Sequence, residues 1–266
     1  MIRLVYRIVK IYKMGKTKDE LKHIFNDTKR KAWIANLIQT KTKKVKQVPM
    51  VIKPNIIVLD TDTVTAAARY FNIGKTCVLN MASAKTANGG VADGETAQEE
   101  CLFRCSNLGE SITQDLYPLE EDEALYTKNA IFFKDKDYND MKMVKVDVVT
   151  MASVNLNPNA KYDEKTETWT EGLVPKSNDY WKVTTMKIRT ILSLAAKNKC
   201  KYVILGAWGC GVFKNEPYDM ADAFAQVLID EGYERLFDQV VFAIINDNNS
   251  VADNLSIFKD VFNVDD

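Results

Sequence analysis

Residues 77–100 read CVLNMASAKTANGGVADGETAQEE and contain a strand, a glycine loop and the start of a helix. The apolar run Cys77–Asn80 predicts a short buried strand, and Thr96–Asn107 predicts a helix. Between them, Asn88-Gly89-Gly90 precedes Gln98-Glu99-Glu100 by a spacer of seven residues. Adjacent glycines let a ligand approach the backbone closely because no Cβ intrudes. Carboxylates in the first turn of the helix would point back over this loop, where the helical amides favour anions.

The rest of the chain from residue 54 alternates short apolar runs with helical patterns, which predicts a mostly parallel sheet covered on both faces. Further strands are predicted at Ile56–Leu59, Ala130–Phe133, Val144–Thr150, Tyr202–Leu205 and Val240–Ile245. Further helices are predicted at Val64–Phe71, Tyr180–Lys197, Asp219–Asp230 and Leu255–Phe262. In such sheets ligands bind beyond the carboxyl ends of the strands. The polar and glycine-rich motifs all fall at that edge.

A second glycine loop, Gly206-Ala-Trp-Gly-Cys-Gly-Val-Phe213, follows the strand Tyr202–Leu205. Three glycines in six residues before a helix favour a phosphate cradle, although a plain strand-to-helix turn has the same composition. The run is neither a Walker sequence nor a dinucleotide fingerprint. Cys210 within it is a further candidate nucleophile, but no histidine lies near it in the sequence to activate the thiol.

Two acidic motifs have a structural alternative to a functional role. Thr96-Ala97-Gln98-Glu99 fits a capping box, in which Glu99 would only cap its own helix. Asp60-Thr61-Asp62 follows a predicted strand, so Asp62 either accepts a hydrogen bond from a ligand amine or caps the next helix.

Composition narrows the chemistry that the chain can perform. The 266 residues include one histidine, His23, and five cysteines with no CxxC pair. A zinc site or a histidine-based triad is therefore nearly excluded, and the odd cysteine count favours a reducing, cytoplasmic location. No apolar run reaches the length of a membrane-spanning helix. Catalysis would depend on carboxylates, backbone dipoles or a cysteine.

Residues 1–53 are predicted to form a basic, mainly helical extension, and residues 54–266 the main domain. The extension carries 15 Lys and Arg against 3 Asp and Glu, although the whole chain is neutral. A helix is expected over Lys18–Gln39 and a basic linker over Thr40–Gln47. Such an arm either binds a polyanion such as nucleic acid or folds back on the acidic body. The first fifteen residues lack the uninterrupted apolar stretch of a signal peptide, and Met14 is an alternative start.

The two glycine loops resemble those of the bacterial-type poly(ADP-ribose) glycohydrolases, a branch of the macrodomain fold. The signature of this family is three glycines, six to eight residues, then Gln-Glu-Glu. Asn88-Gly89-Gly90 and Gln98-Glu99-Glu100 match it with a spacer of seven, except that Asn88 stands at the first glycine. Leu79–Ala84 is similar to the strand and loop that precede the glycines, and residues 206–213 are similar to the diphosphate loop. The resemblance extends over about Lys29 to Phe262 and implies that residues 54–266 form a macrodomain-like domain, a three-layer α/β/α sandwich with a mixed, mostly parallel sheet.

The resemblance also implies the roles of the site residues. Glu100 would donate a proton to the departing 2′-oxygen of a ribose–ribose bond and then activate water, while Glu99 orients the ribose hydroxyls. Gln98 would support the two glutamates, Asn80 the distal ribose and Asp62 the adenine amine. The substrate-binding loops would comprise Asn88, Gly89, Gly90 and Val91 on one side and Gly209, Cys210, Gly211, Val212 and Phe213 on the other. No metal or cofactor is implied, the partner would be ADP-ribose polymer or ADP-ribosylated protein, and the product would be ADP-ribose.

Two departures leave other activities open. Asn88 replaces the first glycine of the signature, although asparagine tolerates left-handed backbone geometry, and Lys214 replaces a small residue after the diphosphate loop. The alternatives are a hydrolase of mono-ADP-ribosyl groups, a non-catalytic ADP-ribose reader, and an enzyme that cleaves NAD or nucleotide sugars.

Overall fold

The computed structural model describes residues 16–31, 39–41, 55–157, 161–163, 168–170, 178–248, 250 and 252–264. Its main sheet has seven strands in the order β1-β4-β5-β3-β8-β9-β2. The strands are β1 (Gln39–Lys41), β2 (Asn55–Asp60), β3 (Thr76–Met81), β4 (Leu125–Lys134), β5 (Asp140–Met151), β8 (Tyr202–Leu205) and β9 (Gln239–Ile244). Neighbours from β2 to β5 in this order pair in parallel, whereas β4 pairs antiparallel with both β5 and β1. The expected mixed, mostly parallel sheet is confirmed.

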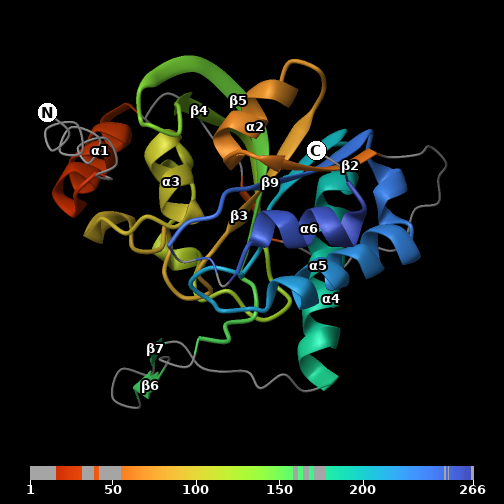
Figure 1. Ribbon diagram of the computed structural model, residues 1–266. Helices are drawn as coiled ribbons and strands as arrows, with labels where there is room; N and C mark the ends of the chain where they lie inside the picture. Colours follow the sequence, from red (N-terminus) through yellow and green to blue (C-terminus); the bar gives the residue numbers. More distant parts are fainter. Residues whose placement is uncertain are drawn as a thin grey trace, which may run out of the picture.

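Helices cover both faces of the sheet, so that the domain has three layers (Figure 1). One face packs against α4 (Asn178–Lys197), α5 (Pro217–Ala225) and α6 (Asn254–Phe262). The other face packs against α1 (Lys18–Lys31), α2 (Thr63–Tyr70) and α3 (Gln98–Cys105). This is the macrodomain-like sandwich that the sequence predicts. No helix among the described residues is long and apolar enough to cross a membrane.

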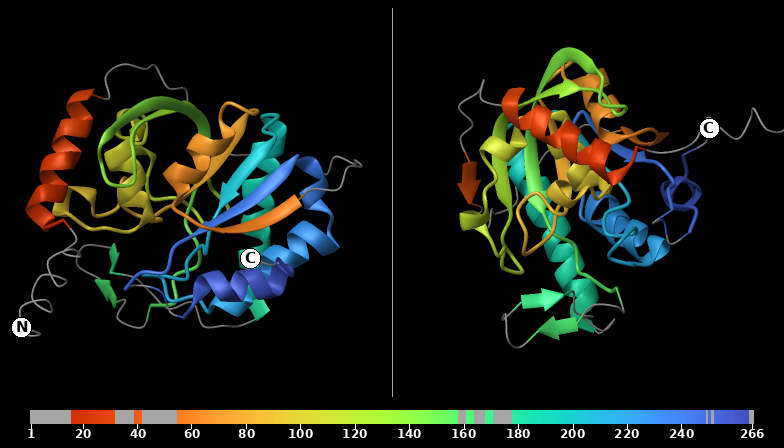
Figure 2. Two further views of the ribbon diagram at one scale, coloured as in Figure 1. Left: turned by 45° about the horizontal axis from the view of Figure 1, so that its top comes forward. Right: turned by 90° about the vertical axis from the view of Figure 1, so that its left-hand side faces the viewer.

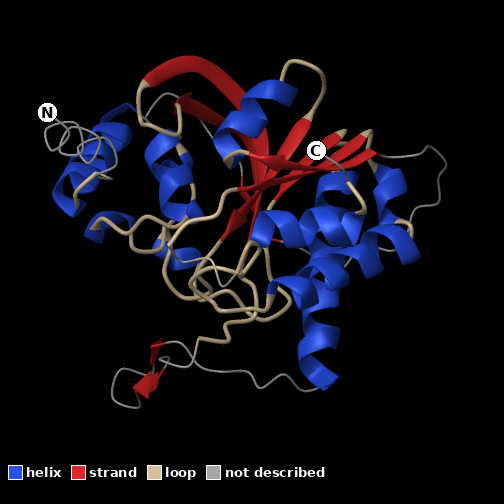
Figure 3. Ribbon diagram, viewed as in Figure 1, coloured by secondary structure: helices blue, strands red, loops and turns tan. Residues whose placement is uncertain are grey.

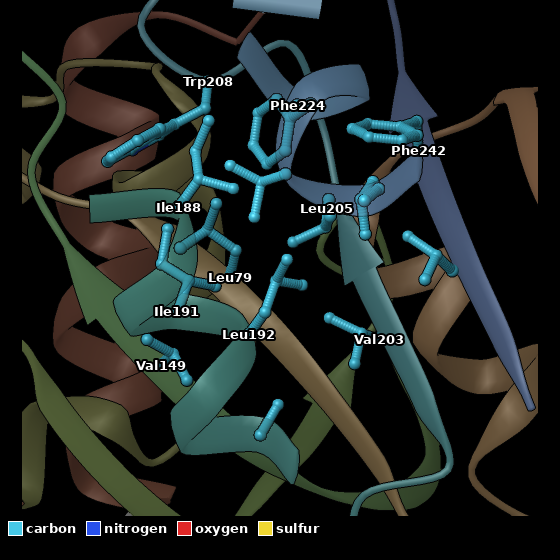
Figure 4. Close-up of a cluster of buried hydrophobic side chains, with 14 of the residues drawn as sticks. Leu79, Val149, Ile188, Ile191, Leu192, Val203, Leu205, Trp208, Phe224 and Phe242 are labelled. Atoms are coloured by element: carbon cyan, nitrogen blue, oxygen red, sulfur yellow. The ribbon is translucent and has the colours of Figure 1, made fainter. Parts of the chain in front are cut away.

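Alternating side chains on the central strands build a separate hydrophobic core on each face. Leu79, Val203 and Leu205 point to the α4–α6 side, where they meet Ile188, Leu192 and Phe224 (Figure 4). Their neighbours Val78 and Ile204 point to the α1–α3 side. The central strands are thus buried on both faces, which is why they read as continuous apolar runs in the sequence.

The elements differ from the sequence expectations mainly at the edges of the sheet. The predicted strands at 130–133 and 144–150 lie within the longer strands β4 and β5, which form a hairpin. The predicted helix 219–230 begins at Pro217 as α5, and its last turn, Gln226–Asp230, widens to a π-helix. The sequence did not reveal β1 or the small hairpin of β6 (Lys161–Asp163) and β7 (Thr168–Thr170), since strands of three residues carry no clear periodicity.

The N-terminal extension packs against the main domain wherever it is described. α1 lies alongside α3, as both views in Figure 2 show, and buries Leu21 and Phe25. β1 adds an antiparallel strand to β4, with Thr40 opposite Tyr126, so the predicted basic linker begins within the sheet. The remainder of the predicted helix beyond Lys31 and of the linker beyond Lys41 lies outside the described residues. The domain boundary after residue 53 stays a prediction.

Candidate functional site

A cleft of about 1010 Å³ lies at the carboxyl ends of the parallel strands. The loops that follow these strands gather at this edge of the sheet and are drawn in tan in Figure 3. The walls of the cleft come from both glycine loops, from the first turns of α2 and α3, and from the segment between β9 and α6. Ten of the fourteen candidate site residues line it: Asp62, Gly89, Gly90, Gln98, Glu99, Glu100, Gly209, Gly211, Val212 and Phe213.

Glu100 presents one oxygen that is not bound by the protein. Its Oε1 accepts a hydrogen bond from the Gly90 backbone N–H at 2.8 Å. Its Oε2 is buried and has no hydrogen-bond partner in the described part of the chain. The side chain lines the cleft but is only 6% exposed. A carboxyl group held by one oxygen, with the other unpartnered at a cleft wall, is arranged to exchange a proton with a bound molecule.

Both oxygens of Glu99, in contrast, are bound by the protein. The Asn80 side-chain amide donates to Oε1 at 3.1 Å, and the Ser83 backbone N–H donates to Oε2 at 2.9 Å. Burial disfavours the charged carboxylate and, with a smaller contribution from Glu100, raises the pKa of Glu99 to about 8. Glu99 does not cap its helix, because Ala97 holds the N-cap position without a side-chain hydrogen bond. The capping-box alternative is therefore wrong.

Gln98 joins three elements at the base of the cleft. Its Oε1 accepts from the Met81 backbone N–H at 3.0 Å, and its Nε2 donates to the Leu79 carbonyl at 2.8 Å and to Thr63 Oγ1 at 3.1 Å. The first turn of α3 is thereby fixed to β3 and to α2. This arrangement fits the supporting role that the family resemblance implies for Gln98.

The first glycine loop closes directly over the two glutamates. Gly89 has a left-handed φ of 55°, and a Cβ at this position would collide with Glu100 Oε1 and approach Glu99 Oε2 to 3.0 Å. Asn88 also adopts the left-handed region, with a φ of 70°, as its residue type allows. Asn88 and Val91 do not line the cleft, and Val91 is buried in the core.

The second glycine loop is held from below by Asn215, which the sequence reasoning missed. Asn215 Nδ2 donates to the carbonyls of Val154 at 2.7 Å and Gly209 at 3.1 Å, and its Oδ1 accepts from the Tyr180 hydroxyl at 2.8 Å. A Cβ on Gly209 would lie 2.5 Å from both Asn215 Nδ2 and Ser153 Oγ. Asn215 follows the last glycine of the loop, Gly211, by four residues, but nothing in its sequence context distinguishes it from a surface turn residue.

For three candidate residues, the contacts in the structure differ from the direct contact with a ligand that the sequence suggested. Asn80 is fully buried beneath Glu99 and does not line the cleft, so it contacts the carboxylate rather than the space above it. Cys210 is also fully buried, and burial raises the pKa of its thiol, which does not fit a nucleophile. Asp62 lines the cleft but caps α2, accepting from the Thr65 backbone N–H at 2.9 Å.

Further residues that line the cleft were not among the candidate site residues. Ser83 and Ser153 come from the loops after β3 and β5, and Asn254 starts α6. Lys136 and Tyr138 come from the β4–β5 turn, which is distant in sequence from every motif. Lys214 has a left-handed φ of 55°, is exposed and does not line the cleft. The described residues contain no group of three histidine, cysteine or acidic side chains arranged to hold a metal ion.

The fold and the cleft define a macrodomain-like α/β protein with two glutamates facing paired glycine loops. Residues 8–135 match the family model of the microbial-type PARG catalytic domain, where PARG is poly(ADP-ribose) glycohydrolase. The resemblance to this family is thus confirmed. No curated protein matches the chain.

Solved structures of bacterial enzymes are similar over almost the whole chain. Poly(ADP-ribose) glycohydrolase from Thermomonospora curvata is 25% identical with a TM-score of 0.66, and the match covers 92% of this chain and 84% of that one. The enzyme from Deinococcus radiodurans in complex with ADP-ribose is 24% identical with a TM-score of 0.67, and the match covers 92% and 91% of the two chains.

Proposed function

We propose that this protein is a poly(ADP-ribose) glycohydrolase that cleaves ribose–ribose O-glycosidic bonds and releases ADP-ribose. The observation that carries the proposal is the unpartnered Oε2 of Glu100, buried at the wall of the cleft while Oε1 is fixed by Gly90. The match to the microbial-type PARG catalytic domain covers both glutamates and the first glycine loop, and so supports the same activity.

The two glutamates have different tasks in this proposal. Glu100 donates a proton from Oε2 to the departing 2′-oxygen as the bond to the anomeric carbon breaks. The carboxylate that remains then takes a proton from water, whose oxygen attacks the oxocarbenium-like carbon, so that Glu100 regains its proton and the product carries a new hydroxyl. Glu99 is held on both oxygens by Asn80 and Ser83 and serves to orient the ribose rather than to transfer a proton. The scheme uses one acid/base group, unlike the usual pair in glycosidases.

The second glycine loop provides the complementary charge for the diphosphate. The backbone N–H groups of Gly211, Val212 and Phe213 donate no hydrogen bond to another residue in the described chain. Amides grouped in this way form an anion-binding concavity. Asn215 fixes the loop through the Gly209 carbonyl, so the donors are in place before a ligand arrives. The first turn of α3 adds its own dipole to the same cleft.

Asn88 does not obstruct this site. The departure from the three-glycine signature is the main sequence reason to consider a non-catalytic reader. Two observations support activity despite this departure: Asn88 is not among the residues that line the cleft, and its φ of 70° is one that a glycine would also adopt. Hydrolysis is accordingly favoured over binding alone.

The test is incubation of the purified protein with poly(ADP-ribose) and, in parallel, with mono-ADP-ribosylated protein and mono-ADP-ribosylated nucleic acid. Free ADP-ribose is followed by chromatography. Release from the polymer supports the proposal. Release only from a mono-modified substrate would replace it with a mono-ADP-ribosyl hydrolase. Binding of ADP-ribose with no release from any substrate would make the protein a reader.

A further inference from the structure

The N-terminal helix α1 contacts the segment that continues the first glycine loop, residues 91–95, directly. Lys18 at the start of α1 forms an ion pair with Glu95, with Nζ and Oε1 2.6 Å apart. Gly94 has a left-handed φ of 82°, and a Cβ there would lie 2.6 Å from the Lys18 carbonyl oxygen. The backbones of α1 and of the loop are therefore in close contact within five residues of Gly90. Only a glycine permits this approach.

Arg104 connects the same two segments from inside the protein. It is fully buried on α3, one turn after Glu100. Its Nε donates to the Leu21 carbonyl of α1 at 3.2 Å, and its Nη2 donates to the Val91 carbonyl of the glycine loop at 3.2 Å. The Thr28 hydroxyl of α1 donates in turn to the Arg104 carbonyl. One guanidinium thus joins α1 to the residue that follows Gly90.

Packing alone does not explain an arginine at this position. Taking a guanidinium out of water is costly, and apolar residues of similar volume often stabilise a core better than a buried charge. What arginine adds is a rigid planar set of donors that can hold two carbonyl groups at fixed positions. At this position the two carbonyls belong to α1 and to the loop that carries the Gly90 N–H.

Apolar and charged contacts hold the rest of α1 in place. Leu21 and Phe25 are buried, and Phe25 belongs to the hydrophobic cluster on the α1–α3 side of the sheet. At the far end of the helix, Asp27 pairs with the buried Lys134 at 2.6 Å. Just before α1, Lys16 lies over the ring of Tyr138, 5.6 Å from its centroid, and Tyr138 also lines the cleft. The N-terminal segment therefore contacts the β4–β5 turn as well as the first glycine loop.

We propose that α1, acting through Arg104, is a positioning element that fixes the Gly90 N–H against Glu100. Arg104 does not touch the substrate and is a positioning residue rather than a catalytic one. Its catalytic consequence rests on the proposed function, but its effect on the loop is independent of any activity.

The test compares Arg104→Met with Leu194→Ala by hydrogen–deuterium exchange of the peptide that covers residues 88–95. Leu194 is buried on α4, on the other face of the sheet, and serves as a control for a general loss of stability. We expect exchange in the loop to become about tenfold or more faster in Arg104→Met, because two hydrogen bonds of a charged group are lost. In Leu194→Ala the loop should exchange no more than about twofold faster under conditions where both variants are folded.

Activity provides the second measurement. In Arg104→Met, kcat for ADP-ribose release should fall about tenfold while KM changes less than about threefold, because the carboxyl loses its alignment but the diphosphate loop is untouched. Unchanged loop exchange in folded Arg104→Met overturns the proposal, whether or not the wild type is active. An inactive wild type with accelerated loop exchange in the variant instead refutes the proposed function and leaves the positioning of the loop by Arg104 supported.

A second variant decides the matter if Arg104→Met does not fold. Phe25→Ala weakens the docking of α1 and leaves Arg104 and the loop chemically intact. It should accelerate exchange of residues 88–95 more than Leu194→Ala does. Equal exchange in the two variants would show that α1 does not position the loop.

Discussion

Gly89→Ala tests whether the position of the Glu100 carboxylate matters for activity, separately from the effect of backbone strain. Gly89 has a φ of 55°, so an alanine there pays the left-handed penalty of about 1–2 kcal/mol. Its Cβ would also collide with Glu100 Oε1 and approach Glu99 Oε2 to 3.0 Å. To reach ordinary van der Waals separation the Glu100 carboxylate has to move by roughly 1 Å. A misplacement of this size is expected to lower kcat about 100-fold.

Gly232→Ala is the matched control for this variant. Gly232 has a φ of 75°, but the nearest atom to a Cβ there is 3.7 Å away, on Arg235, and Gly232 does not line the cleft. Both variants should therefore lose about 1–2 kcal/mol of stability in thermal or urea unfolding, and only Gly89→Ala should lose activity. ADP-ribose release from polymer gives kcat for each. If kcat of Gly89→Ala stays within about threefold of that of Gly232→Ala, the carboxylate position does not control the reaction and the reasoning is refuted.

Two other substitutions test the remaining parts of the site. Gly209→Val places a side chain against Asn215 Nδ2 and Ser153 Oγ, each 2.5 Å from the Cβ. The variant should bind ADP-ribose about tenfold or more weakly in calorimetry, because the loop has to shift. Unchanged affinity would mean that the diphosphate binds elsewhere. Glu99→Gln tests the pKa of Glu99, which is raised to about 8. Between pH 4.5 and 8, Glu99 keeps its proton in the folded protein, whereas in the unfolded chain it loses that proton near the ordinary pKa of 4.5. The stability of the wild type should therefore fall relative to that of the variant as the pH rises from 4.5 to 8. Parallel pH profiles of the melting temperature for the two proteins would contradict that protonation state.

The sequence predicted the layers of the fold because its buried strands are continuous apolar runs. The strands at 77–80 and 202–205 stand out for this reason, and their carboxyl ends locate the cleft. The elements missed are those whose pairing is set by tertiary contacts. β1 is three residues long and lies in a basic stretch, so only its partner β4 defines it as a strand.

The sequence predicted the parts of the candidate site where the backbone requires glycine. It was less informative about the side chains that support the site by binding other site residues. Gly89 and Gly209 are required by left-handed conformations and close contacts, which the glycine spacing suggested. Asn80 and Asn215 hold the Glu99 side chain and the second glycine loop through hydrogen bonds to partners that are remote in sequence. Arg104 bridges residues 83 and 13 positions away, which no local pattern encodes.

The most direct test of the central claim is the release of ADP-ribose from poly(ADP-ribose) by Glu100→Gln, measured beside the wild type together with the affinity of each for ADP-ribose. Glutamine keeps an oxygen that can accept from the Gly90 N–H, but its amide N–H is not acidic enough to transfer a proton to the leaving oxygen. The account predicts that the variant binds ADP-ribose within about threefold of the wild type while turnover falls by a factor of about 100 or more. Hydrolysis of the polymer by Glu100→Gln at the wild-type rate would contradict it and would place the catalytic proton on another group.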